Sequence, residues 1–288
     1  MNRTDVFPFA PAAGWKGKGF AFLAIAGFLI LVTSVVFAEA VFLRRFAAAT
    51  PENTFAESEW AMALAVVVGT FLMAWMRGRH FGDYGLGGRK KGRNFLAGIS
   101  AGIALLAVQL LTMKLAGTFS FGIPAIGLKE ALAAGGFCAV TYLGVALFEE
   151  TAFRGYVLAE LSQAVSFWPA ALLLALLFGG AHLLNGGTES LMAAGMAGLF
   201  GLVLAILFRL TGSLWLSIGI HAGWDFGESF LFGVPDSGTV STVRLMQSAA
   251  HGPDWLSGGA AGPEGSVFVL LPLAAFLLIG AKLGRRRF

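Results

Sequence analysis

Charged residues are scarce in this sequence, and their scarcity excludes an ordinary soluble domain. Only 12% of the 288 residues are Asp, Glu, Lys or Arg, while 57% are hydrophobic; soluble domains carry about 25% charged residues. Cysteine is nearly absent, because Cys138 is alone, and this excludes a disulfide framework. We expect Cys138 to be a small buried packing residue. We assign the net charge of +4 to membrane topology and contact with the lipid bilayer, not to nucleic acid.

What the sequence does contain is a series of long apolar stretches. Each is close to the roughly 20 residues that a helix needs to cross the hydrocarbon layer. They cover residues 19–43, 60–76, 95–113, 137–160, 167–187, 190–208, 212–232 and 266–281. Because they leave no room for a soluble domain, we expect an all-α fold. Residues 1–288 would form one integral-membrane domain, a polytopic transmembrane helical bundle of about eight spans.

The basic residues predict the orientation of this bundle. Residues 76–94 hold six basic residues and one acid, which indicates a cytoplasmic loop. Lys16, Lys18 and the C-terminal "KLGRRRF" indicate that both ends are inside as well, while Arg44 and Arg45 are exceptions. Residues 233–265, rich in Gly, Ser and Pro, would be a flexible extracytoplasmic loop. In a prokaryote, this topology places the chain in the plasma membrane.

The stretch "LFEETAFRGY" (147–156) places three charges beside eighteen uncharged residues, 131–148. Charges inside a membrane are costly, and they mark functional sites. On a helix, Glu150 and Arg154 lie four residues apart and can pair, whereas Glu149 points about 100° away. Burial raises the pKa of an unpaired carboxylate and suits it to act as a general base. The alternative is a salt-bridged cluster that only joins helices.

Two later apolar stretches also carry ionisable residues. "FGGAH" places His182 four residues after Phe178, and "HAGWDF" places His221 four residues before Asp225. Exposing these ionisable side chains to lipid would cost free energy, so we expect them to lie near Glu149 inside the bundle. To bring them to one depth, we start the helix that holds Glu149 after Gly135 and Gly136, so that it spans residues 137–160.

Small residues recur in "AAGMAGLFG" (193–201) at a spacing of four. The pairs Ala194/Gly198 and Ala197/Gly201 lie on one helical face. This pattern predicts close packing against a neighbouring helix.

The three motifs together resemble the CPBP (Abi) family of intramembrane proteases, which includes the CAAX prenyl endopeptidases. The family's signature is a doubled glutamate with arginine four residues after the second, then Phe-x-x-x-His, then His-x-x-x-Asn or Asp. Here these are "EETAFR" at 149–154, "FGGAH" at 178–182 and "HAGWD" at 221–225. The resemblance covers residues 95–232, which we expect to be the catalytic core.

The resemblance implies a role for each matching residue. Glu149 would polarise the attacking water with help from His182, and His221 would stabilise the oxyanion. Glu150 and Arg154 would hold the site together. This chain has Asp225 at a position where some other members have asparagine. We expect Asp225 to accept a hydrogen bond from His221, fixing its tautomer and favouring its charged form.

The resemblance also leaves alternatives open. Members are often called metalloproteases, and Glu149, His182 and His221 could hold zinc. However, no HExxH motif is present, so we expect no cofactor and glutamate-activated water. The expected function is an endopeptidase that cleaves a lipidated or membrane-associated peptide or protein. One alternative is a catalytically silent membrane scaffold or bacteriocin-immunity-like protein. Another is a proton-coupled transporter, which fits the charges but not the ordered motifs.

Overall fold

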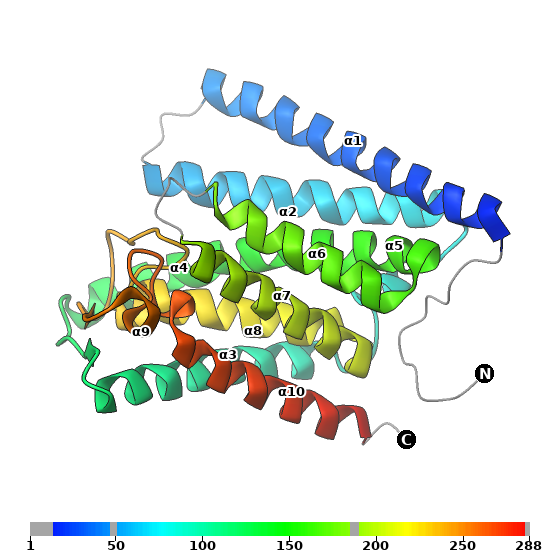
Figure 1. Cartoon of the computed structure of the whole chain (residues 1–288). Coiled ribbons are helices and arrows are strands. Elements are labelled where there is room, and N and C mark those ends of the chain that lie inside the picture. Colours follow the sequence, from blue (N-terminus) through cyan, green and yellow to red (C-terminus); the bar gives the residue numbers. More distant parts are fainter. Residues whose placement is uncertain (1–13, 47–50, 185–189, 286–288) are drawn as a thin grey trace.

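A computed structural model describes residues 14–46, 51–184 and 190–285, most of which are helical (Figure 1). The longer helices are α1 (Gly14–Phe46), α2 (Pro51–Met76), α3 (Lys91–Leu115), α4 (Leu128–Glu149), α5 (Leu158–Val165), α6 (Phe167–His182), α7 (Leu191–Thr211), α8 (Leu214–Phe226) and α10 (Leu270–Arg285). The short elements are η1 (Phe81–Tyr84), η2 (Glu150–Val157), η3 (Gly227–Phe232), α9 (Asp254–Ser257), η4 (Pro263–Gly265), η5 (Val267–Val269) and the strands β1 (Phe119–Ser120) and β2 (Ala249–Ala250). The expected apolar window 167–187 and the basic end "KLGRRRF" both extend beyond the described residues.

Five helical stretches of the described chain are long and apolar enough to cross a membrane: Lys16–Ala38, Thr54–Met76, Lys91–Leu115, Leu128–Val165 and Leu191–Thr211. Two further apolar helices, Phe167–His182 and Val267–Lys282, are shorter. The expectation of a helical integral membrane protein is therefore supported. The count of about eight spans and the N-in, C-in orientation stay predictions.

The helix that carries Glu149 differs from the expected one. It does not begin after Gly136: helix α4 begins at Leu128 and continues through η2 and α5 to Val165. Gly135 and Gly136 remain helical, because neighbouring apolar residues outweigh the modest helix penalty of glycine. Glu149 nevertheless falls in the interior of the continuous stretch, because that stretch also extends beyond residue 160. Its central part, η2, is a π-helix, a local widening that is frequent at functional sites.

Helix α8 lies at the centre of the bundle, with its residues from Leu216 to Asp225 all buried. It packs against α3, α4 and α7, and Figure 1 shows α3 and α10 on one side of it and α1 and α2 on the other. Two glycines of α3 allow an unusually close approach. A Cβ on Gly98 would lie 2.5 Å from the Leu216 carbonyl oxygen, and one on Gly102 would lie 2.4 Å from that of Ile220. Helix α8, which carries two of the expected site residues, is thus held against α3 by direct backbone contact.

The small-residue face predicted on α7 packs as expected. A Cβ on Gly198 would lie 2.8 Å from the Ala175 carbonyl oxygen, so α7 approaches α6 closely at this point. Gly201 meets the same helix at the Phe178 ring, and a Cβ there would also collide with the guanidinium of Arg154.

Residues 233–265 are more structured than their Gly-rich sequence indicates. Strand β2 pairs antiparallel with β1, with Phe119 opposite Ala250. The Gln109 side chain donates to the Pro263 carbonyl oxygen at 2.6 Å, which ties η4 to α3. This segment lies at one end of the bundle, opposite the connection between α2 and α3 (Figure 1).

Candidate active site

The residues expected to form a site do come together. Glu149 ends α4, His182 ends α6, and His221 and Asp225 lie one turn apart on α8. All four line one cavity of about 860 Å³. Three helices that are distant in sequence therefore present their ionisable side chains to the same space.

The imidazole of His221 is the centre of this arrangement. Its Nδ1 lies 2.9 Å from Glu150 Oε1. On the other side of the ring, Nε2 lies 3.6 Å from Glu149 Oε2 and 3.5 Å from Asp225 Oδ2. The Glu150 side chain is fully buried, whereas 23% of the Glu149 side chain is exposed. The doubled glutamate thus supplies one carboxylate behind the ring and one facing the cavity.

Glu150 and Arg154 form the ion pair that the sequence predicts. Arg154 Nη1 donates to Glu150 Oε1 at 3.0 Å, and its Nε donates to the Gly201 carbonyl oxygen at 3.3 Å. The guanidinium also stacks on the ring of Phe178, with Cζ 4.0 Å from the ring centroid. Arg154 is only 3% exposed, so this pair joins η2, α6 and α7 behind the cavity.

The structure places a carboxylate closer to the His221 ring than Asp225, for which the sequence predicts the orienting role. The acceptor within hydrogen-bond distance of the His221 ring is Glu150, on Nδ1. Asp225 approaches Nε2 without making a hydrogen bond of normal geometry. Since a His at i and an Asp at i+4 share a helical face, the sequence predicts proximity correctly. It does not reveal that Glu150, from another helix, lies closer to the ring.

The tautomer of His182 is set by its own helix. Its Nδ1 lies 2.8 Å from the Phe178 carbonyl oxygen, so Nδ1–H donates to that backbone oxygen. In the neutral ring, Nε2 then keeps its lone pair and can accept a hydrogen bond from water in the cavity. Phe178 therefore makes two contacts in the site: its ring packs against the Arg154 guanidinium, and its carbonyl oxygen accepts a hydrogen bond from His182.

Most of the remaining cavity wall is apolar. It is formed by Phe55, Phe137, Val145, Phe148, Phe153, Phe200 and Trp224. Phe55 of α2 and Phe137 of α4 are 44% and 43% exposed, so the cavity wall lies at the protein surface where these two helices contribute to it, as it also does at Val240, which is 50% exposed. A few polar groups at the end of an apolar cleft are typical of a ligand site.

Three acidic residues of this cavity were not identified from the sequence: Glu59 of α2, Asp236 and Glu264. Glu59 directly precedes the apolar window 60–76, where an acid is expected to end a span. Asp236 and Glu264 belong to the Gly-rich segment 233–265, for which solvent exposure is the usual expectation. No spacing rule connects these residues to the three motifs.

The zinc alternative requires donors of Glu149, His182 and His221 to converge. Within the described ranges, the group of three acidic, His or Cys side chains with ligand atoms within 4.8 Å of one another is a different one, Glu228, Asp236 and Glu264. The donors of Glu149, His182 and His221 are thus not gathered within that distance, and the choice between zinc and metal-free chemistry stays a prediction.

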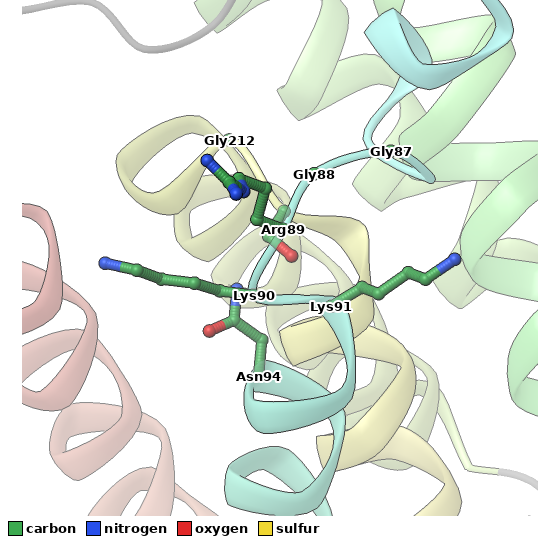
Figure 2. Close-up of a pocket in the computed structure, with 8 residues that line it drawn as sticks. Gly87, Gly88, Arg89, Lys90, Lys91, Asn94 and Gly212 are labelled. Atoms are coloured by element: carbon green, nitrogen blue, oxygen red, sulfur yellow. The ribbon is translucent and has the colours of Figure 1, made fainter.

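A second, smaller cavity of about 250 Å³ lies at the start of α3, lined by Arg89, Lys90, Lys91 and Asn94 among others. Figure 2 shows the Lys90 and Lys91 side chains pointing in opposite directions. Because its cationic groups do not converge, this cavity is not the better candidate.

Comparison with known proteins supports the family resemblance. Residues 132–227 match the family described as type II CAAX prenyl endopeptidase Rce1-like. No curated protein and no solved structure matches the chain. The matched segment contains all three motifs, from Glu149 to Asp225. The resemblance to the CAAX proteases is thus confirmed over residues 132–227, which match the Rce1-like family of type II CAAX prenyl endopeptidases.

Proposed function

We propose that this protein is an intramembrane endopeptidase in which Glu149 activates a water molecule. The observation that carries the proposal is the pair of adjacent glutamates. Glu150 is buried between Arg154 and His221, while Glu149 faces a cavity with apolar walls. A carboxylate in that position can take a proton from water, and the surrounding helices limit competing solvent.

The hydrolysis uses three side chains of the cavity. Glu149 takes a proton from the water as the water oxygen bonds to the carbonyl carbon of the substrate, and Nε2 of His182 accepts from the same water. The carbonyl electrons move to oxygen, and Nε2–H of His221 donates to this oxyanion. When the intermediate collapses, the carbon–nitrogen bond breaks and the leaving nitrogen takes the proton from Glu149.

The carboxylates around His221 support its role. An imidazole donates from both nitrogens only when it is protonated. The carboxylates of Glu150, Glu149 and Asp225 surround the ring at 2.9, 3.6 and 3.5 Å and stabilise that form. In this scheme Glu150 orients the ring, and Asp225 adds negative charge beside Nε2.

The position of the cavity at the protein surface supports a proposal for the substrate class. The exposed Phe55 and Phe137 border it between α2 and α4, two helices apolar enough to lie in a membrane. A peptide held at the membrane by a lipid or a helical anchor can enter there. We therefore propose a lipidated or membrane-associated peptide or protein as substrate, in keeping with the family.

Cleavage of a defined peptide pool by the purified protein tests this function. Membrane-anchored peptides with and without a prenylated cysteine are incubated with the protein in liposomes, and mass spectrometry identifies the products. Wild type should cleave peptides of the pool, and Glu149→Gln should lower the rate by about 10²–10⁴-fold while folding normally.

Glu57→Gln is the matched control, because Glu57 is exposed on α2 and does not line the cavity. It should cleave at the wild-type rate. If Glu149→Gln keeps most of the activity, Glu149 is not the base. If wild type cleaves nothing in the pool, the scaffold alternative is favoured. The prenylated and unprenylated arms show whether the lipid is required.

A further inference from the structure

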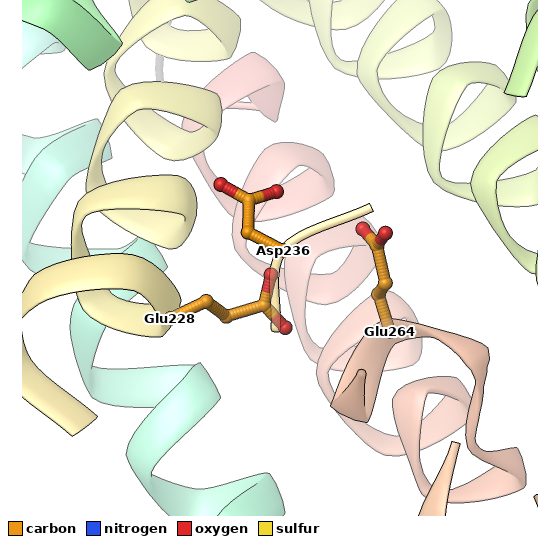
Figure 3. Close-up of side chains that lie close together, drawn as sticks. All are labelled: Glu228, Asp236 and Glu264. Carbon is orange, nitrogen blue, oxygen red and sulfur yellow. The ribbon is translucent and has the colours of Figure 1, made fainter. Parts of the chain in front are cut away.

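A second group of ionisable residues lies outside the proposed catalytic set. Three residues each offer a carboxylate oxygen, and these oxygens lie within 4.8 Å of one another. The residues are Glu228 of η3, Asp236 in the loop that follows η3, and Glu264 of η4. Figure 3 shows the three carboxylates, which come from separate segments of the chain, lying close together. They join the end of the α8–η3 helix to the segment that leads into α10.

Glu228 is the unusual member of this group. It is 0% exposed, and within the described part of the chain neither of its carboxylate oxygens has a hydrogen-bond partner. The Trp224 side chain interacts with it from one helical turn earlier, but without the geometry of a hydrogen bond. Leaving a buried carboxylate unsatisfied is costly, more so than leaving a neutral polar group unsatisfied.

The other two carboxylates are held in place by serine hydroxyls. Ser229 Oγ donates to Asp236 Oδ2 at 2.9 Å, and Ser237 Oγ donates to Glu264 Oε1 at 2.7 Å. These contacts orient the two carboxylates but do not neutralise them. Like charges so close together require a counter-charge or a proton.

The donor set selects among possible cations. All three ligands are carboxylates, with no imidazole or thiolate, which favours a hard cation over zinc or copper. Magnesium usually binds through one or two carboxylates and keeps several waters, whereas calcium takes six to eight oxygen ligands. Three converging carboxylates supply up to six oxygens. The adjoining cavity, which Asp236 and Glu264 line, can supply water.

We propose that Glu228, Asp236 and Glu264 form a calcium site that fixes the 233–265 segment to the end of the α8–η3 helix. The consequence reaches the main cavity, because residues 236–242 form part of its wall. A bound cation would hold that wall in one position. The proposal does not depend on protease activity, since it rests on the carboxylate geometry alone.

Direct binding to the purified full-length protein in detergent tests the site. The protein is stripped of metal and titrated with calcium alone and, in a parallel arm, with magnesium alone. Equilibrium dialysis should show about one tight calcium equivalent per chain, with weaker magnesium binding, and thermal denaturation should show a calcium-dependent rise in Tm. Glu228→Gln and Glu264→Gln should each lower calcium affinity at least about tenfold and remove the rise in Tm.

Asp254→Asn is the control, because Asp254 is an exposed carboxylate of the same segment outside the cluster. It should bind calcium as wild type does. The absence of saturable calcium binding to wild type overturns the proposal, as does an unchanged affinity in both Gln variants. Tighter binding of magnesium overturns the choice of ion. If Glu228→Gln stabilises the protein and calcium has no effect on wild type, the counter-charge is a proton. Glu264→Gln, at a partly exposed position, keeps the test valid should Glu228→Gln fail to fold.

Discussion

At the residue scale, two adjacent glutamates occupy opposite electrostatic environments. Glu150 accepts from both Arg154 and His221 and is shut off from solvent, whereas Glu149 is partly exposed in the cavity. The sequence allows this division to be predicted, because residues four apart on a helix share a face and adjacent residues do not. It does not allow the partner of His221 to be predicted, since Glu150 and His221 are separated by 71 positions.

Removing Arg154 should damage stability. In Arg154→Ala, Glu150 loses its buried partner, and breaking such a pair costs about 3–5 kcal/mol. Thermal denaturation in detergent should therefore show a clear loss of stability. Arg93→Ala, which removes an exposed arginine from the first turn of α3, should have no such effect. An Arg154→Ala protein as stable as its parent but inactive would mean that the guanidinium acts in catalysis.

Two substitutions distinguish the acceptors around His221. Glu150→Gln removes the charge that holds Nδ1 at 2.9 Å, so the ring should lose its orientation. We therefore expect activity to decrease by up to about 10²–10³-fold, which is the loss seen when an oxyanion donor is removed. Asp225→Asn should cost less, because Asp225 lies beside Nε2 without holding the ring. The measurement is kcat/KM for both variants, with circular dichroism to verify folding. A larger loss in Asp225→Asn would return the orienting role to Asp225.

At the scale of elements, close packing between α3 and α8 positions half of the proposed catalytic set. Helix α8 carries His221 and Asp225, and its backbone touches α3 at Gly98 and Gly102. The glycines at 219 and 223 meet α3 in the same way, with Cβ positions 2.3 Å from the Phe95 carbonyl oxygen and 2.6 Å from that of Ile99. Each of the two helices thus carries a pair of glycines four residues apart. Nothing in either one indicates that the other is its partner, so the contact could not be predicted.

Gly102→Ala should therefore disturb both stability and activity. The new methyl group would lie 2.4 Å from the Ile220 carbonyl oxygen, which forces α8 away and costs about 1–3 kcal/mol. Gly92→Ala in the same helix meets no atom within 4 Å and should be neutral or stabilising by up to about 1 kcal/mol. Thermal denaturation and cleavage rate are measured for both variants. Equal behaviour of the two would show that α3 does not fix the position of α8.

At the scale of the whole molecule, hydropathy predicted the presence of the helices better than the residues at which they begin and end. Each expected apolar window corresponds to a helix, because uncharged runs near 20 residues have few other stable arrangements. The predicted start of the helix that carries Glu149 was wrong, since glycine inside an apolar run is only a weak signal for a helix end. The cavity wall from 236 to 242 was also missed, because the turn between Asp236 and Thr239 and the hydrogen bond from Gly238 to the Ala261 carbonyl oxygen leave no periodic signal in the sequence.

The claim that Glu149 and His182 activate water directly is tested by the cleavage rate under zinc removal. Purified wild type is treated with a zinc-selective chelator while calcium is kept in excess, so that the proposed carboxylate site stays filled, and the rate of peptide cleavage is measured. The account predicts an unchanged rate. A rate that falls to background and returns on addition of about one equivalent of zinc per chain would contradict it, and would make Glu149, His182 and His221 the metal ligands to examine.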